Sequence, residues 1–123
     1  MTVAPNPNLQ LLYVSDIGRS TDFYKTIFEA EPVFSSPRYV AFGAGKEALF
    51  AIWTGAEDPD FSARRCSEVG IMLPSNEEVQ KLFEKWKDNS DIKIVTEPRT
   101  EIFGLTFLVE DPDGNLIRVC PLD

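Results

Sequence analysis

One order of strand and helix patterns occurs in the first half of the chain and recurs in the second half, and this repetition constrains the fold most strongly. Residues 9–15 are rich in β-forming types and end at an Asp16-Ile17-Gly18 turn signal. A helix is expected next, with Ser20 as its N-cap. Its apolar face recurs at helical spacing, at Phe23, Tyr24, Ile27 and Phe28. Three short β-rich segments follow, at residues 33–35, 38–42 and 48–53.

The second half repeats this order. A strand pattern at 68–73 precedes Pro74-Ser75, and the acidic Glu77 and Glu78 predict the start of a helix there. The apolar face of this helix is formed by Val79, Leu82, Phe83 and Trp86. Three more strand patterns come at 92–96, 105–110 and 116–120. An Asp-Pro-Asp-Gly turn, residues 111–114, joins the last two.

Sliding one half over the other places Leu9 on Glu68 and Phe50 on Arg118. Internal repetition of this kind predicts two similar modules, each with the order βαβββ, at about 8–54 and 66–121. The chain has 123 residues, which is enough for one domain with a hydrophobic core but short for two independent domains. We therefore expect a single α+β domain, spanning 1–123, that is made of two βαβββ modules.

Charge and hydropathy exclude several classes of partner. The formal net charge is −8 and no Lys/Arg cluster offsets it, which argues against nucleic acid as a partner. No apolar stretch reaches the length of a membrane span, and the N-terminus lacks the pattern of a secretory signal. We expect no membrane association and a cytoplasmic location, where Cys66 and Cys120 would stay reduced.

Three runs of residues together resemble the vicinal oxygen chelate superfamily, which contains glyoxalases, bleomycin-resistance proteins and dioxygenases. They are Leu12-Tyr13-Val14-Ser15-Asp16, Asp22-Phe23-Tyr24 and the segment 110–117, which contains Asp-Pro-Asp-Gly. Within the superfamily the chain is most similar to the phenazine-antibiotic resistance proteins, which bind an aromatic antibiotic. The resemblance covers nearly the whole chain and implies two curved mixed sheets, each wrapping a cup. It also implies a homodimer, and the N-terminal arm 1–8 is a candidate to cross to the partner subunit.

The resemblance further implies where a metal would bind, because enzymes of the superfamily take ligands from the first and last strands of each module. Those places fall on Leu9, Phe50, Glu68 and Arg118. Leucine and phenylalanine have no donor atom, and arginine is a permanent cation. The chain has no histidine, and Glu68 alone could not retain a divalent ion. We expect no metal and no cofactor.

Glu68 and Arg118 should instead contact each other, because their counterparts in the superfamily reach a common ion. The interpretation is that a carboxylate-guanidinium pair replaces the metal bridge. The alternative is a surface ion pair that contributes less than about 1 kcal/mol.

An apolar cup lined by Leu9 and Phe50 favours a planar aromatic ligand. Trp53 is the expected stacking platform, with packing in the core or at an interface as the alternative. Phe50 and Trp53 are three residues apart, so a bulge or twist would have to bring Trp53 to the same side. Phe103 is expected to close the mouth of the cup as a mobile loop residue.

Three further residues are candidate ligand contacts. Arg38 would supply a positive charge and Tyr39 a hydroxyl, although a solvated surface role is the alternative for Arg38. Met72 shares the strand parity of Glu68 and is therefore expected to face the same cup.

The leading hypothesis is a binding protein without catalytic residues, which sequesters a phenazine-like antibiotic and so confers resistance. One alternative is a metal-independent enzyme that uses Glu68 as acid or base, although the partner Arg118 would lower the pKa of Glu68 and make it a poor base. A glyoxalase-like lyase is a further alternative. Another is a structural or regulatory module whose cup is filled by its own side chains.

Overall fold

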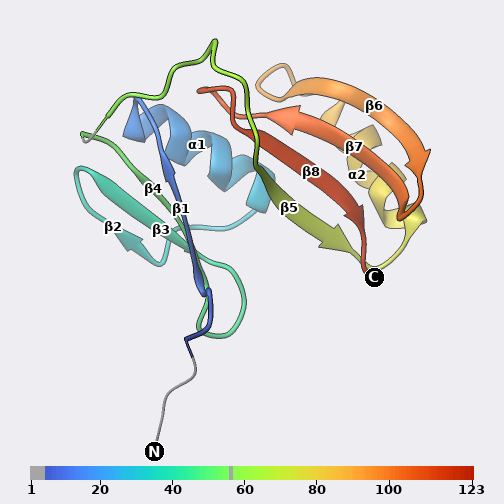
Figure 1. Ribbon diagram of the computed structural model, residues 1–123, viewed down its shortest axis with the longest axis horizontal. Helices are drawn as coiled ribbons and strands as arrows, with labels where there is room; N and C mark the ends of the chain where they lie inside the picture. Colours follow the sequence, from blue (N-terminus) through green and yellow to red (C-terminus); the bar gives the residue numbers. More distant parts are fainter. Residues whose placement is uncertain (1–4, 56) are drawn as a thin grey trace, which may run out of the picture. The chain divides into compact units, whose positions relative to one another are not determined.

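The computed structural model describes residues 5–55 and 57–123, so residues 1–4 of the predicted crossing arm lie outside the described residues. The chain divides into two compact units, 1–59 and 60–123. Each unit contains one of the two predicted modules, and each has one helix and one mixed four-stranded sheet. The expected order βαβββ is confirmed in both halves (Figure 1).

The N-terminal unit is built around a sheet with the strand order β1-β4-β3-β2. β1 pairs in parallel with β4, and the other pairs are antiparallel. Its elements are β1 (Leu9–Tyr13), α1 (Ile17–Phe28), β2 (Phe34–Ser35), β3 (Tyr39–Gly43) and β4 (Leu49–Trp53). The segment between β3 and β4 forms a hairpin, in which Gly45 has a φ of 101°.

Helix α1 begins at Ile17, and residues 14–16 connect it to the end of β1 at Tyr13. The side chain of Asp16 accepts a hydrogen bond from the amide of Arg19 at 3.0 Å and is the N-cap. The predictions of a turn at residues 16–18 and of a cap at Ser20 are therefore wrong, because Asp16 already satisfies the first free amides of the helix. Ser20 lies one turn inside the helix and is buried.

The core of the N-terminal unit lies between α1 and one face of its sheet. The ring of Phe50 in β4 packs 4.7 Å from that of Tyr24 and 5.1 Å from that of Phe28, between centroids. Because successive side chains of a strand point to opposite faces, Ile52 shares the helix-covered face, and Ala51 and Trp53 point the other way. We call the face of each sheet that is turned away from its helix the distal face.

The C-terminal unit has the corresponding sheet order β5-β8-β7-β6. Its elements are β5 (Glu68–Leu73), α2 (Asn76–Trp86), β6 (Lys93–Glu101), β7 (Gly104–Glu110) and β8 (Leu116–Pro121). Ser75 caps α2, and the rings of Phe83 and Trp86 pack on Phe107 at 5.4 and 5.8 Å. β6 is longer than predicted, because two register shifts let it follow the curve of β7 as far as a tight hairpin (Figure 1).

The turn between β7 and β8 is held by its own side chains. One oxygen of the buried Asp111 accepts hydrogen bonds from the amides of Asp113 and Asn115, both at 2.8 Å. Arg65 donates to the carbonyls of Asp113 and Gly114 and so ties the segment before β5 to this turn. The predicted Asp-Pro-Asp-Gly turn is thus confirmed, with Gly114 at a φ of 85°.

Neither helix in the described part of the chain combines the length and the apolar character needed to cross a bilayer.

Candidate functional site

The predicted alignment of the two halves is wrong by one residue at the last strand of each module. In the C-terminal sheet Gly70 lies opposite Arg118, and in the N-terminal sheet Leu11, the equivalent of Gly70, lies opposite Ala51. The counterpart of Arg118 is therefore Ala51 and not Phe50. A slip of one residue moves a side chain to the other face of a sheet, which explains why Phe50 is buried against α1 with 4% of its surface exposed. The prediction that Phe50 lines the cup is wrong.

The same register places Trp53 on the distal face without any bulge. Tyr13 lies opposite Trp53 in the parallel pair, and their rings meet edge to face at 5.4 Å. Tyr39 lies opposite Trp53 from the other side, in β3. The ring of Phe34 in β2 is 6.0 Å from the ring of Tyr39. These four side chains, one from each strand, form what we call the aromatic row.

The aromatic row is accessible at both ends, because Tyr13 is 44% exposed and Phe34 is 55% exposed. Trp53 and Tyr39 were predicted from the sequence as ligand contacts, whereas Tyr13 and Phe34 were not. The parity that Tyr13 shares with Leu9 was a usable signal for Tyr13. No pattern in the sequence could have placed Phe34, because its strand has only two residues.

Arg38 lies beside the aromatic row, but its guanidinium is engaged by the backbone. Its Nη2 donates to the carbonyl of Gly55 at 2.7 Å, and its Nε donates to that of Thr54 at 3.4 Å. Gly55 has a φ of 99°, and a Cβ there would lie 2.0 Å from Nη2. Arg38 therefore closes the end of β4 next to Trp53, with its guanidinium held by two backbone carbonyls.

On the distal face of the C-terminal sheet, the predicted contact between Glu68 and Arg118 is confirmed. The Nε and Nη2 atoms of Arg118 donate to the two carboxylate oxygens at 2.7 and 3.0 Å, in a bidentate arrangement. The Nη1 atom donates to the hydroxyl of Thr106 at 3.0 Å, and that hydroxyl donates to the carbonyl of Val119. The hydrogen bonds from Arg118 lower the pKa of Glu68 in spite of its partial burial.

Phe103 adds an aromatic ring to this pair. It lies in the turn of the β6–β7 hairpin, is 46% exposed, and its ring centroid is 5.8 Å from the Cζ of Arg118. Met72 lies opposite Cys120 on the same face of the sheet and is exposed. Four of the predicted ligand contacts, Glu68, Met72, Phe103 and Arg118, thus belong to one distal face, while Arg38, Tyr39 and Trp53 belong to the N-terminal unit.

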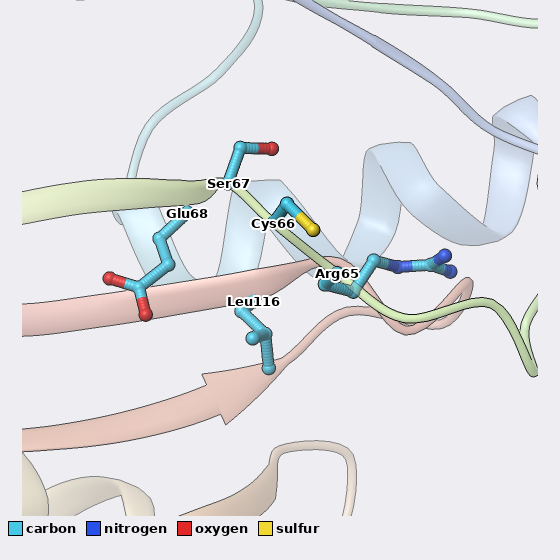
Figure 2. A pocket seen from close by; sticks show the side chains of 5 residues that line it. All are labelled: Arg65, Cys66, Ser67, Glu68 and Leu116. Atoms are coloured by element: carbon cyan, nitrogen blue, oxygen red, sulfur yellow. The ribbon is translucent and has the colours of Figure 1, made fainter.

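An open pocket adjoins the ion pair at the beginning of β5 and β8. It is lined by Arg65, Cys66, Ser67, Glu68 and Leu116 (Figure 2). In Figure 2 the guanidinium of Arg65 points away from the carboxylate of Glu68, toward the loop before β8. Glu68 is therefore the charged group that this pocket shares with the distal face.

The positions that correspond to metal ligands do not fit a divalent ion. Leu9 and Ala51 provide no donor atom, Arg118 is a cation, and both oxygens of Glu68 accept hydrogen bonds from Arg118. Over residues 5–55 and 57–123, no group of three or more His, Cys, Asp or Glu side chains is arranged to hold a metal.

Comparison with known proteins places these features in a family. The model of the Glyoxalase/Bleomycin resistance protein/Dioxygenase superfamily matches residues 7–119. The phenazine antibiotic resistance protein EhpR of Enterobacter agglomerans is 58% identical over 119 residues, which are 95% of this chain and 92% of EhpR.

Solved structures agree on the fold. The solution NMR structure of a protein from Agrobacterium tumefaciens has a TM-score of 0.80 at 28% identity, over 98% of this chain and 99% of that chain. A mutant of the fosfomycin resistance protein FosX from Listeria monocytogenes, complexed with Mn(II), has a TM-score of 0.75 at 21% identity, over 95% of this chain and 90% of that chain.

Proposed function

Because the chain belongs to the Glyoxalase/Bleomycin resistance protein/Dioxygenase superfamily, we propose that it serves the resistance function for which its relative EhpR is named. The protein binds a planar aromatic compound of the phenazine class and lowers the free concentration of that compound. It uses no metal and does not transform its ligand. The single observation that carries this proposal is the replacement of metal-ligand positions by Leu9, Ala51 and the Glu68–Arg118 pair.

Two surfaces supply contacts of the right chemistry. The aromatic row presents ring surface drawn from all four strands of the N-terminal sheet, and stacking on such rings contributes about 0.5 to 1.5 kcal/mol beyond burial. The distal face of the C-terminal sheet presents Phe103 and Met72 beside a neutralised ion pair. Apolar surface with few polar groups is the usual composition of sites for small molecules.

The enzyme alternatives have less support. An acid-base role for Glu68 requires a carboxyl whose pKa lies near neutral pH, whereas Arg118 moves the pKa of Glu68 in the opposite direction. A glyoxalase-like lyase needs a metal, and the donor set does not fit one. A module whose cup is filled internally would leave the aromatic row covered, whereas Phe34 and Tyr13 are exposed.

The test is a titration with phenazine that is monitored by tryptophan fluorescence. The compound is then recovered and its mass is measured. The chain has two tryptophans. The second, Trp86 in α2, is buried against Phe107 of β7, so Trp86→Phe is a matched control. Binding with unchanged compound supports the proposal. We expect Trp53→Ala to weaken binding about 2- to 13-fold if the aromatic row is the platform.

Elemental analysis complements the titration. Turnover of the compound, or a stoichiometric zinc, nickel, iron or manganese content on which turnover depends, would contradict the proposal. Absence of any response to phenazine and related tricyclic compounds would favour the filled module.

A further inference from the structure

We propose that Asn76 is a positioning residue, which fixes the β6–β7 hairpin so that Phe103 stands over Arg118 and forms a rigid wall for a planar ligand. This inference rests on the proposed function and concerns the distal face of the C-terminal sheet. Asn76 is the first residue of α2 and is far from Phe103 in the sequence.

The first step is the geometry of the hairpin turn. Glu101 and Gly104 form its last pair, so Ile102 and Phe103 are the two residues of the turn. Ile102 is fully exposed, and no contact of its own side chain holds the turn in place. Gly104 has a φ of 121°, a backbone conformation that residues other than glycine rarely adopt.

The second step is the hydrogen bond that holds this turn. The amide of Leu105 donates to the Oδ1 atom of Asn76 at 3.0 Å. The pairing of β7 with β8 begins only at Phe107, opposite Val119, so β8 does not supply the acceptor for Leu105. The side chain of Asn76 satisfies an amide that the sheet leaves free.

The third step is the close packing around Gly104. A Cβ at this position would lie 2.6 Å from the Cγ of Pro121 and 3.0 Å from the Oδ1 of Asn76. The hairpin tip therefore lies directly against β8 and the start of α2, with no room for adjustment on that side. Asn76, Gly104 and Pro121 together determine where the turn can lie.

The consequence is a preset position for Phe103. Arg118 is fixed at its edges by Glu68 and Thr106, and the Phe103 ring is 5.8 Å from its Cζ. A ring that is already placed loses little conformational entropy when a ligand stacks on it. Loss of the Asn76 hydrogen bond would let the turn move and would remove this advantage, although Asn76 itself lies on no ligand surface. The expectation that Phe103 is a mobile loop residue is replaced here by a ring held in place.

The test is a double-mutant cycle on phenazine affinity, measured by calorimetry. We expect Asn76→Ala and Phe103→Ala each to weaken binding by about 3- to 10-fold. The double variant should be no weaker than Phe103→Ala, because Asn76 acts only through the ring. Asn76→Asp keeps a side-chain acceptor for the Leu105 amide and should bind like the wild type.

Two measurements separate positioning from a general loss of stability. Hydrogen exchange of the Leu105 amide should be faster in Asn76→Ala and protected in Asn76→Asp. Glu77→Ala, a change at an exposed residue in the same helical turn, should leave affinity unchanged.

The outcomes separate this inference from the proposed function. Additive effects in the double variant, or normal affinity in Asn76→Ala, would overturn the positioning role while phenazine binding stands. Failure of the wild type to bind would overturn the proposed function and this role with it.

Discussion

The ion pair between Glu68 and Arg118 should stabilise the fold more than other ion pairs of the same sheet. Each carboxylate oxygen accepts its own N–H of the guanidinium, and the two side chains are 34% and 27% exposed. The perturbation is the pair of substitutions Glu68→Ala and Arg118→Ala, made singly and together. The cycle isolates the coupling energy from the separate effects of each truncation, including the loss of the Arg118 bond to Thr106.

The expected magnitude follows from the degree of shielding. Fully exposed pairs couple by less than about 1 kcal/mol, and breaking a fully buried pair costs about 3 to 5 kcal/mol. The Glu68–Arg118 pair lies between these limits, so we expect a coupling energy of about 1 to 2 kcal/mol. Lys93 and Glu110 form a control ion pair on the same sheet, with 2.9 Å between Nζ and Oε1. Their side chains are 70% and 15% exposed. Their coupling should be about 0.5 kcal/mol or less.

The assay is urea unfolding at neutral pH and again in acid. Because Arg118 holds the pKa of Glu68 below its ordinary value of 4.5, the carboxylate is favoured in the folded protein. Its stabilisation is complete above the pKa of the unfolded chain and is lost as the pH falls through the pKa of the folded protein. The coupling should therefore disappear in acid. A coupling at neutral pH no larger than that of the control pair, or one that persists after Glu68 is protonated, would refute this reasoning.

Three further predictions concern other parts of the molecule. Phe50→Ala should lower the free energy of unfolding by about 3 to 5 kcal/mol in denaturant, and an unchanged stability would show that the ring is not in the core. Asp16→Ala should lower the free energy of unfolding by about 1 kcal/mol through loss of the cap. Ser20→Ala should leave it unchanged, because the buried Ser20 hydroxyl has no hydrogen-bond partner in the described structure. Thermal melts of the two variants would compare these effects. Cys66 is exposed and burial raises the pKa of the Cys120 thiol, so a thiol reagent at mildly alkaline pH should label Cys66 first, as peptide mass mapping would reveal.

The fold could be predicted from the sequence because each half carries its periodicities in full. The apolar spacing around Tyr24 and Trp86 predicts both helices, and the predicted order βαβββ along the chain is correct in both halves. The N-cap of α1 was misassigned because serine and aspartate are both good caps and only three residues separate the end of β1 at Tyr13 from the start of α1 at Ile17. Such ambiguity at an element boundary needs the backbone to resolve it.

The candidate site was predicted less evenly. Glu68 and Arg118 could be paired because the resemblance to the superfamily implies that the residues at these two positions reach a common ion. The pairing of β5 with β8 agrees with that expectation. Phe50 was misplaced because the alignment of the last strands was wrong by one residue. A shift of one residue along a strand moves the side chain to the opposite face of the sheet. The roles of Asn76 and Thr106 come from contacts between elements, for which the sequence carries no periodic signal.

The aromatic row has a consequence for the range of compounds that the protein can recognise. A ring face offers no pattern of donors and acceptors, so it distinguishes molecules by flatness and size and is indifferent to where a heteroatom sits. If phenazines are its cargo, a cell that carries this protein would tolerate a whole series of chemically edited relatives. Moving one substituent on the antibiotic would not prevent it from stacking on this surface, whereas a change that makes the molecule non-planar would.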